Sequence, residues 1–136
     1  MKNLTTAIYG KLSGSSLSTD IGGRLYKGEA PQDAQFPYVV YFVVSNVPEY
    51  PGGHTIEMAL IQFSLFSSAP GSTEIEDMLT HLRSLYDDVV LTITSETSIY
   101  FIRGNMVTMR DEATTPAGTV GVWHYVQEYD VMVVRT

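Results

Sequence analysis

The densest hydrophobic run in the chain is Tyr38–Ser45, in which seven of eight residues are apolar or aromatic. A strand with one face in water alternates between apolar and polar residues, and this run does not. Pro37 precedes the run and favours an extended conformation at Phe36. The sequence therefore predicts a strand over 38–47 with both faces covered, either inside the domain or by something outside it.

Alternating patterns predict the other strands. In the segment TIEMALIQFSLFS, Ile61 and Phe63 fall on one face, and Met58 and Leu60 fall on the other. The Pro- and Gly-rich segment 48–54 before it predicts a hairpin turn. A second hairpin is expected near the end of the chain, with a loop over 110–119. The expected strands of the two hairpins span residues 38–47, 55–67, 99–109 and 120–134, and the segments 24–27 and 88–95 are candidates for short additional strands.

Helical periodicity marks two segments. In TEIEDMLTHLRSLYDD (73–88), apolar residues recur every three or four positions and form one continuous stripe. Thr73 and Glu76 have the spacing of a capping box at its start. Residues 3–12 repeat apolar side chains at the same spacing, and the stretch that follows, up to Gly23, has the composition of a turn-rich connection.

The order of these elements predicts an α+β fold. We expect an antiparallel β-sheet of two hairpins, about four to five strands, with two helices packed on one face. The 136 residues fit a single domain. In this arrangement one face of the sheet has no cover from within the chain.

Composition narrows the possible partners. The 15 acidic and 8 basic residues give a net charge of −7, and the Lys and Arg residues are not clustered as nucleic-acid binding requires. The absence of cysteine excludes disulfides, thiolate catalysis and Cys-ligated zinc. No apolar run approaches the ~20 residues that cross a bilayer, and the N-terminus lacks the apolar core of a signal peptide. The sequence therefore predicts that the protein is made in a cytoplasm and does not associate with a membrane.

No pattern of catalytic residues emerges. His54, His81 and His124 lack partners at metal-ligand spacing. Glu128 and Asp130 share a strand face and have the residue types of an acid–base pair, although a solvated strand face explains them equally simply. We therefore predict no catalytic residue, no metal, no cofactor and no enzymatic activity.

Several short motifs occur together in the first part of the chain. They are Ala7-Ile8-Tyr9 in the first helix, then Gly23-Arg24-Leu25-Tyr26, Ala30-Pro31 and Phe36-Pro37-Tyr38-Val39-Val40-Tyr41. With the strand IQFSLF, the amphipathic helix and a final strand containing Trp, His and Tyr, the chain resembles the tail completion, or tail terminator, proteins of long-tailed (siphovirus-type) bacteriophages. It departs from that family in its acidic final strand, at Glu128 and Asp130.

The resemblance implies a structural virion protein at the head-proximal end of a phage tail, assembled in the host cytoplasm. Such proteins form a six-fold ring that stops polymerisation of the tail tube and joins the tail to the head connector. The implied partners are further copies of the chain in a hexameric ring, the tail tube protein and the head–tail connector or stopper protein. DNA is expected to pass through the lumen without specific binding, and no cofactor is implied.

A closed ring needs two different patches, one on each side of a subunit. For one patch we predict the strands around the hydrophobic run, with the residues Tyr38, Val40, Phe42, Ile56, Met58 and Leu60. The other patch is expected at a sheet edge or on the N-terminal helix. Contacts along the tail axis are expected in loops 48–54 and 110–119, at Glu49, Tyr50, His54, Asp111 and Glu112.

Three other functions remain open at this point. The chain has the composition of a small α+β ligand- or peptide-binding module whose uncovered sheet face forms a cleft. A different head–tail connector ring protein fits the same pattern. A hydrolase using Glu128 and Asp130 is the third alternative, and it would lose its activity in a Glu128→Gln variant.

Overall fold

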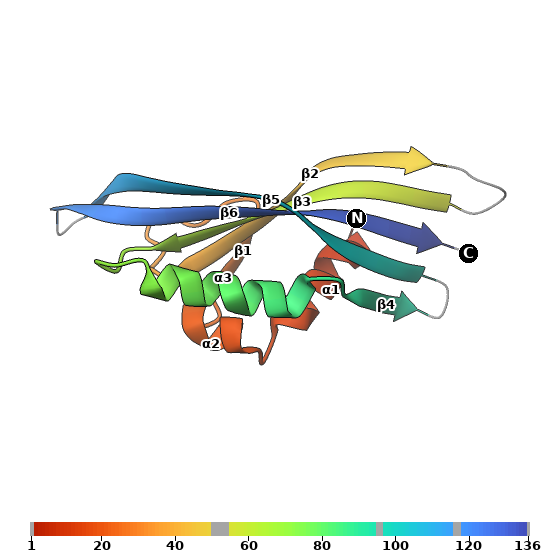
Figure 1. Ribbon diagram of the computed structural model, residues 1–136, viewed down its shortest axis with the longest axis horizontal. Coiled ribbons are helices and arrows are strands. Elements are labelled where there is room, and N and C mark those ends of the chain that lie inside the picture. The colour runs from red at the N-terminus through yellow and green to blue at the C-terminus, as the bar shows by residue number, and fades with distance from the viewer. Residues whose placement is uncertain (1, 50–54, 95–96, 116–117, 136) are drawn as a thin grey trace.

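The computed structural model describes residues 2–49, 55–94, 97–115 and 118–135. Six strands form one sheet in the order β1-β2-β3-β6-β5-β4. The sheet curls into an open half-barrel, and three helices lie together on one side of it (Figure 1). The elements are α1 (Lys2–Leu12), α2 (Ser16–Ile21), β1 (Leu25–Lys27), β2 (Tyr38–Glu49), β3 (Thr55–Ser67), α3 (Thr73–Tyr86), β4 (Val90–Thr94), β5 (Thr97–Thr115) and β6 (Gly118–Arg135).

This architecture corrects the predicted fold class. The sheet has six strands instead of four to five, and it is mixed because β1 pairs in parallel with β2. The described part of the chain contains three helices instead of two, and strands dominate it. The predicted antiparallel sheet with two helices on one face is therefore wrong. The protein is mainly β, with two very long strands, β5 of 19 residues and β6 of 18 residues.

The additional helix, α2, lies where the sequence predicted a turn-rich connection. The Ser15 hydroxyl accepts a hydrogen bond from the N–H of Ser18 at 3.1 Å and caps its start. Gly22, with φ of 59°, ends it in the left-handed conformation. Six residues give fewer than two turns, too few for helical periodicity to appear. Leu17 and Ile21, the two apolar residues of this helix, are both fully buried.

The core lies between the helices and one face of the sheet. Phe63 of β3 stacks on Tyr86 of α3 at 5.0 Å and meets Tyr129 of β6 edge-on at 5.8 Å between ring centres. All three rings are fully buried. The Tyr86 hydroxyl donates to the carbonyl of Ile8 at 2.7 Å, which ties α3 to α1. Burial raises the pKa of Tyr86, so this phenol stays protonated as the donor.

A buried amide fixes β5 to the helix-covered part of the molecule. Gln127 is fully buried, and its carbonyl oxygen accepts from the Arg83 guanidinium of α3 at 2.9 Å and 3.2 Å. Its NH₂ group donates to the carbonyls of Gly104 and Asn105, both at 3.2 Å. Gly104 and Asn105 form the bulge where the register of β5 against β6 shifts by one residue. Beyond this bulge β5 and β6 continue as a hairpin past the helices (Figure 1).

Candidate assembly surface

The face of the sheet opposite the helices is the candidate functional surface, and we call it the open face. Strand register assigns side chains to it, because successive residues point to opposite sides of a sheet. One cross-strand row on the open face joins Val47, Met58, Met132 and Tyr100. In the ribbon, all three helices lie on the other side (Figure 1).

One end of the open face is apolar, and we call it the apolar end. Val47 and Ile102 are each 55 % exposed, and Met58, Leu60 and Met132 are half-buried. Contiguous apolar surface of this kind on a folded domain marks an interaction site. The apolar end consists of Val47, Ile56, Met58, Leu60, Tyr100, Ile102, Met132 and Val134.

The structure places all six predicted interface residues on the open face, but in two groups. Ile56, Met58 and Leu60 belong to the apolar end. The other three lie at the far half of β2, beyond a bulge between Val43 and Ser45 that shifts the register against β3. That second group is Tyr38, Val40 and Phe42.

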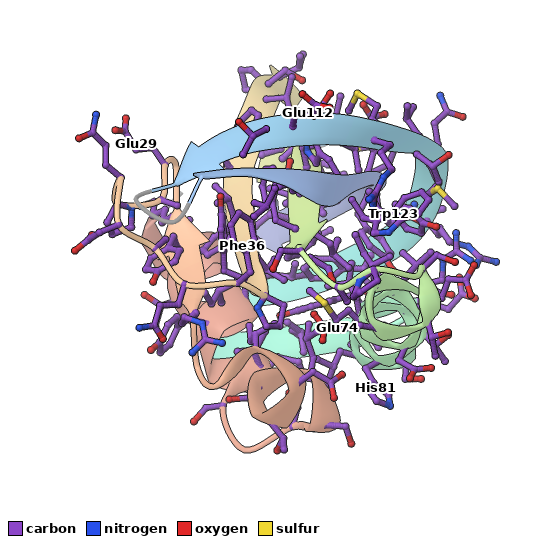
Figure 2. The ribbon with its side chains drawn as sticks, turned by 90° about the vertical axis from the view of Figure 1, so that its left-hand side faces the viewer. Glu29, Phe36, Glu74, His81, Glu112 and Trp123 are labelled. Atoms are coloured by element: carbon purple, nitrogen blue, oxygen red, sulfur yellow. The ribbon has the colours of Figure 1, made fainter. Side chains whose placement is uncertain are left out.

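The second group lines a groove of about 420 Å³ between the open face and the loop that follows β1. Val40 is only 7 % exposed, and Tyr38 stacks on Phe66 at 4.8 Å and on Phe36 of the loop at 5.3 Å. Figure 2 shows Phe36 turned inward toward the sheet and Glu29 on the outer rim of the loop. The hydrophobic run therefore has no alternation because a loop of the same chain covers this part of its second face.

The charges on the open face are all negative. Glu128, Asp130 and Asp111 occupy open-face positions of β6 and β5. Arg103 and Arg110 pair with Tyr129 and Trp123, so they belong to the helix side. No Lys or Arg occupies an open-face position in the described strands. The open face is therefore an acidic surface with an apolar end.

His124 lies at the far end of the open face from the apolar end. Its ring stacks on Phe66 at 4.2 Å, and its Nδ1 is 3.9 Å from an Asp111 carboxylate oxygen. Burial lowers the pKa of His124, and the nearby Asp111 carboxylate partly opposes this. The imidazole is therefore mainly neutral at neutral pH.

The residues predicted to make axial contacts lie at opposite ends of the sheet. Glu49 ends β2 beside the apolar end, while Asp111 and Glu112 are exposed on the β5–β6 hairpin, as Figure 2 shows for Glu112. Tyr50 and His54 lie outside the described residues. The predicted loop over 110–119 is wrong, because β5 continues to Thr115 and β6 begins at Gly118.

Among the described strands, two stretches of edge have no neighbour. β1 pairs only with residues 39–41 of β2, and β4 pairs only with residues 97–100 of β5. No described strand lies along the outer side of β5 from Ile102 onward. Every side chain from Ile102 to Glu112 is exposed. The sequence predicted a strand over 99–109 but not its continuation to Thr115, because the exposed side chains of residues 110–112 carry no burial pattern.

The described residues meet the requirements neither of a metal site nor of a membrane-spanning helix. They include no group of three or more His, Asp or Glu side chains arranged to hold a metal ion. The groove is lined by aromatic and aliphatic side chains together with the polar Glu29, Gln32 and Ser64. Among the described helices, none has the length and hydropathy needed to span a bilayer.

Comparison with known proteins decides the family. The tail completion protein gp17 family matches residues 6–133. The chain belongs to this family. No functionally curated protein matches the sequence.

The fold has a counterpart among solved structures. A chain described as "Virion of native gene transfer agent (GTA) particle" superposes with a TM-score of 0.56 at 11 % identity, over 93 % of this chain and 94 % of that one. At this identity the likeness concerns the fold alone. Together with family membership, it supports a structural virion protein of a phage-like particle. The resemblance inferred from the sequence motifs is confirmed.

Proposed function

We propose that this tail completion protein is a ring-forming tail terminator without enzymatic activity. Copies of the chain form a ring, hexameric as in the proteins it resembles, at the head-proximal end of the tail. The ring stops polymerisation of the tail tube and joins the tail to the head–tail connector or stopper protein. The single observation that carries this proposal is the open face with its uncovered apolar end, in a chain of the tail completion family.

The physical argument concerns what covers the sheet. The three helices cover one face, and the loop after β1 covers part of the other. Apolar surface left in water forgoes roughly 25 cal/mol per Å² of the stabilisation that burial provides. Neighbouring copies in the ring, together with the partner that stacks on this end of the ring, supply the cover in our proposal, with Ile56, Met58 and Leu60 as contact residues. Tyr38, Val40 and Phe42 contribute through the groove.

The acidic character of the open face fits a channel for DNA. In a ring with the helices outside, Glu128 and Asp130 face the lumen. Like-charge repulsion then lets DNA pass without specific binding. Replacing both residues with Arg should slow DNA ejection from assembled particles, and ejection at the wild-type rate would contradict this part of the proposal.

Capping of tail tubes tests the main proposal. Purified protein is mixed with tubes assembled from the tail tube protein of the same virus, and more tube protein is added. We expect a ring at one end of each tube in negative-stain images and no further growth at that end. Growth at both ends despite bound protein would favour a different head–tail connector role.

A matched pair of variants locates the surface. Met58→Glu places a charge in the apolar end and should abolish capping. Thr80→Glu adds the same charge at an exposed position of α3 and should leave capping intact. Both variants should fold, because neither residue is fully buried. A Met58→Glu variant that caps tubes normally would exclude the apolar end as an assembly surface.

The groove beneath the loop is the one observation that favours another function, a peptide-binding module. Such a module would stay monomeric in the presence of tubes and connectors. It would also bind hydrophobic dyes in the groove. Size-exclusion chromatography with light scattering, run with and without tubes, separates the two functions.

A further inference from the structure

Two strand edges without a described neighbour, one on β2 and one on β5, indicate how the ring closes. This inference rests on the proposed function. We propose that the free edge of β5 in one copy pairs, antiparallel, with the free edge of β2 in the next copy. The sheets of all copies then form one closed sheet with the helices outside and the open faces inside.

The edge of β5 is long, and part of it lacks protection against strand pairing. Natural sheets protect free edges with Pro, charged side chains, bulges or very short strands. Between the bulge at Gly104–Asn105 and Arg110, β5 carries only Met106, Val107, Thr108 and Met109, with neither Pro nor charge. Its segment from Ile102 to Glu112 is exposed on both faces, including the apolar Ile102, Met106, Val107 and Met109. An edge of this kind is a template for another strand.

The edge of β2 offers a shorter matching stretch. β1 covers it only as far as Tyr41, so residues 42–47 have no described neighbour on that side. Pro48 cannot donate a hydrogen bond and ends the usable stretch. On the open face, this stretch presents Phe42 and Val47. Both are apolar, as are Val107 and Met109 on the open face of β5.

Strand order makes the two edges compatible. β2, β3, β6 and β5 lie side by side, and each is antiparallel to the next. Because their number is even, β5 runs opposite to β2. Rotation about an axis roughly parallel to the strands keeps strand directions, so β5 meets the next copy's β2 antiparallel. The two edges differ, as a heterologous ring contact requires.

The offset between the edges is also consistent with closure. The free part of β2 lies beside the apolar end, and the free part of β5 lies at the opposite end of the sheet. Neighbouring copies must therefore shift along the strands. A closed sheet requires such a stagger, with its strands tilted to the axis.

Hydrogen-bond directions identify a donor on the free side of β5. The N–H of Phe101 donates to the carbonyl of Val89 at 3.0 Å, on the side away from β6. Phe101 pairs with Val131 of β6, and Thr108 pairs with Tyr125 of β6. The separation between Val131 and Tyr125 along β6 is an even number of residues. Alternation along an antiparallel ladder then directs the N–H of Thr108 to the free side.

Disulfide trapping tests the pairing, because the chain contains no cysteine. Cysteines are placed at Val107 or Met109 of β5, each combined with Ser45 or Val47 of β2, all exposed on the open face. In the presence of tail tubes, we expect at least one of these four double variants to give a ladder of covalent multimers on oxidation. Single variants, and Val107→Cys combined with Thr80→Cys on α3, should give none.

A backbone substitution gives a second, independent measurement. Thr108→Pro removes the free-side N–H and should abolish rings on tubes, while Thr108→Val, which keeps the N–H, should form them. Far-UV circular dichroism and thermal melting establish that both variants fold. Rings of the folded Thr108→Pro variant at wild-type occupancy would overturn the pairing.

The two proposals fail in different ways. Rings on tubes without any multimer ladder mean that the copies meet by another surface, which refutes the edge pairing and leaves the terminator function standing. Wild-type protein that forms no ring on tubes refutes the terminator function itself, and the edge pairing with it.

Discussion

The two faces of the sheet differ in how completely this chain covers them. On the helix side, Phe63 and Tyr129 are fully buried among aromatic neighbours. On the open face, Ile102 and Val47 remain more than half exposed. Both faces carry apolar residues, but only the open face also carries the acidic Glu128 and Asp130. The helix side therefore stabilises the monomer, whereas the open face, in our proposal, contacts other molecules.

The largest expected effect compares two phenylalanines of β3 on opposite faces. Phe63→Ala empties a fully buried site between Tyr86 and Tyr129 and should lower the free energy of unfolding by about 3–5 kcal/mol. Phe66→Ala removes a half-buried ring on the open face and should cost clearly less. Urea denaturation of the monomer measures both. Equal losses would contradict the division of roles between the faces.

Two glutamines provide the next comparison. Gln127→Leu leaves the Arg83 guanidinium and the carbonyls of the β5 bulge without their partner, and should cost roughly 2–3 kcal/mol. Gln62→Leu, at a half-buried open-face position of β3, should change stability little. Hydrogen exchange of the β5 amides should accelerate only in Gln127→Leu. Unchanged exchange there would show that the amide does not hold the bulge.

A smaller effect is expected from a single hydroxyl. The Tyr129 phenol donates to an Asp87 carboxylate oxygen at 2.7 Å, and burial together with this bond raises its pKa. Tyr129→Phe should cost about 1.5 kcal/mol, because the ring stays in place and one hydrogen bond to a carboxylate is lost. Tyr100→Phe, exposed on the open face, serves as the control and should stay within about 0.5 kcal/mol of wild type. Urea denaturation distinguishes the two.

The smallest effect concerns pH at the open face. An unfolded histidine has a pKa of about 6.5, and burial lowers the pKa of His124 in the folded protein. Below about pH 6.5 the unfolded chain therefore binds more protons at this site than the folded protein does. The free energy of unfolding decreases as the pH is lowered. In His124→Phe, the fall between about pH 7.5 and about pH 5.5 should be smaller than in wild type. An identical fall would show that His124 contributes nothing to it.

Local patterns in the sequence were reliable where one face of an element is buried. The strand 55–67 was predicted with the bounds it has, and so was the start of α3 at Thr73. The prediction that Glu128 and Asp130 share a strand face was also correct, since both lie on the open face of β6 and Tyr129 between them is buried on the other side. The predicted capping box at Thr73 was wrong. Ser72 occupies the N-cap position, and its hydroxyl contacts the Glu76 carboxylate at 3.3 Å.

The candidate surface was predicted only in part. The side chains of Ile56, Met58 and Leu60 lie on the uncovered face, as the alternation indicated. The loop that covers Val40 was not predicted, because a segment such as KGEAPQDAQ carries no pattern that says where it folds. The free edge of β5 was missed for a related reason. Which strand lies at an edge depends on pairing between segments far apart in the chain.

The sequence by itself determined the periodic elements, their buried faces and the tail completion family, because these follow from short-range spacing and local motifs. Only the tertiary structure decided that the sheet is mixed and curled, that β5 and β6 extend beyond the helices, and which edges remain bare. Those features arise from strand pairing and from the buried contacts of Gln127, which join residues distant in sequence.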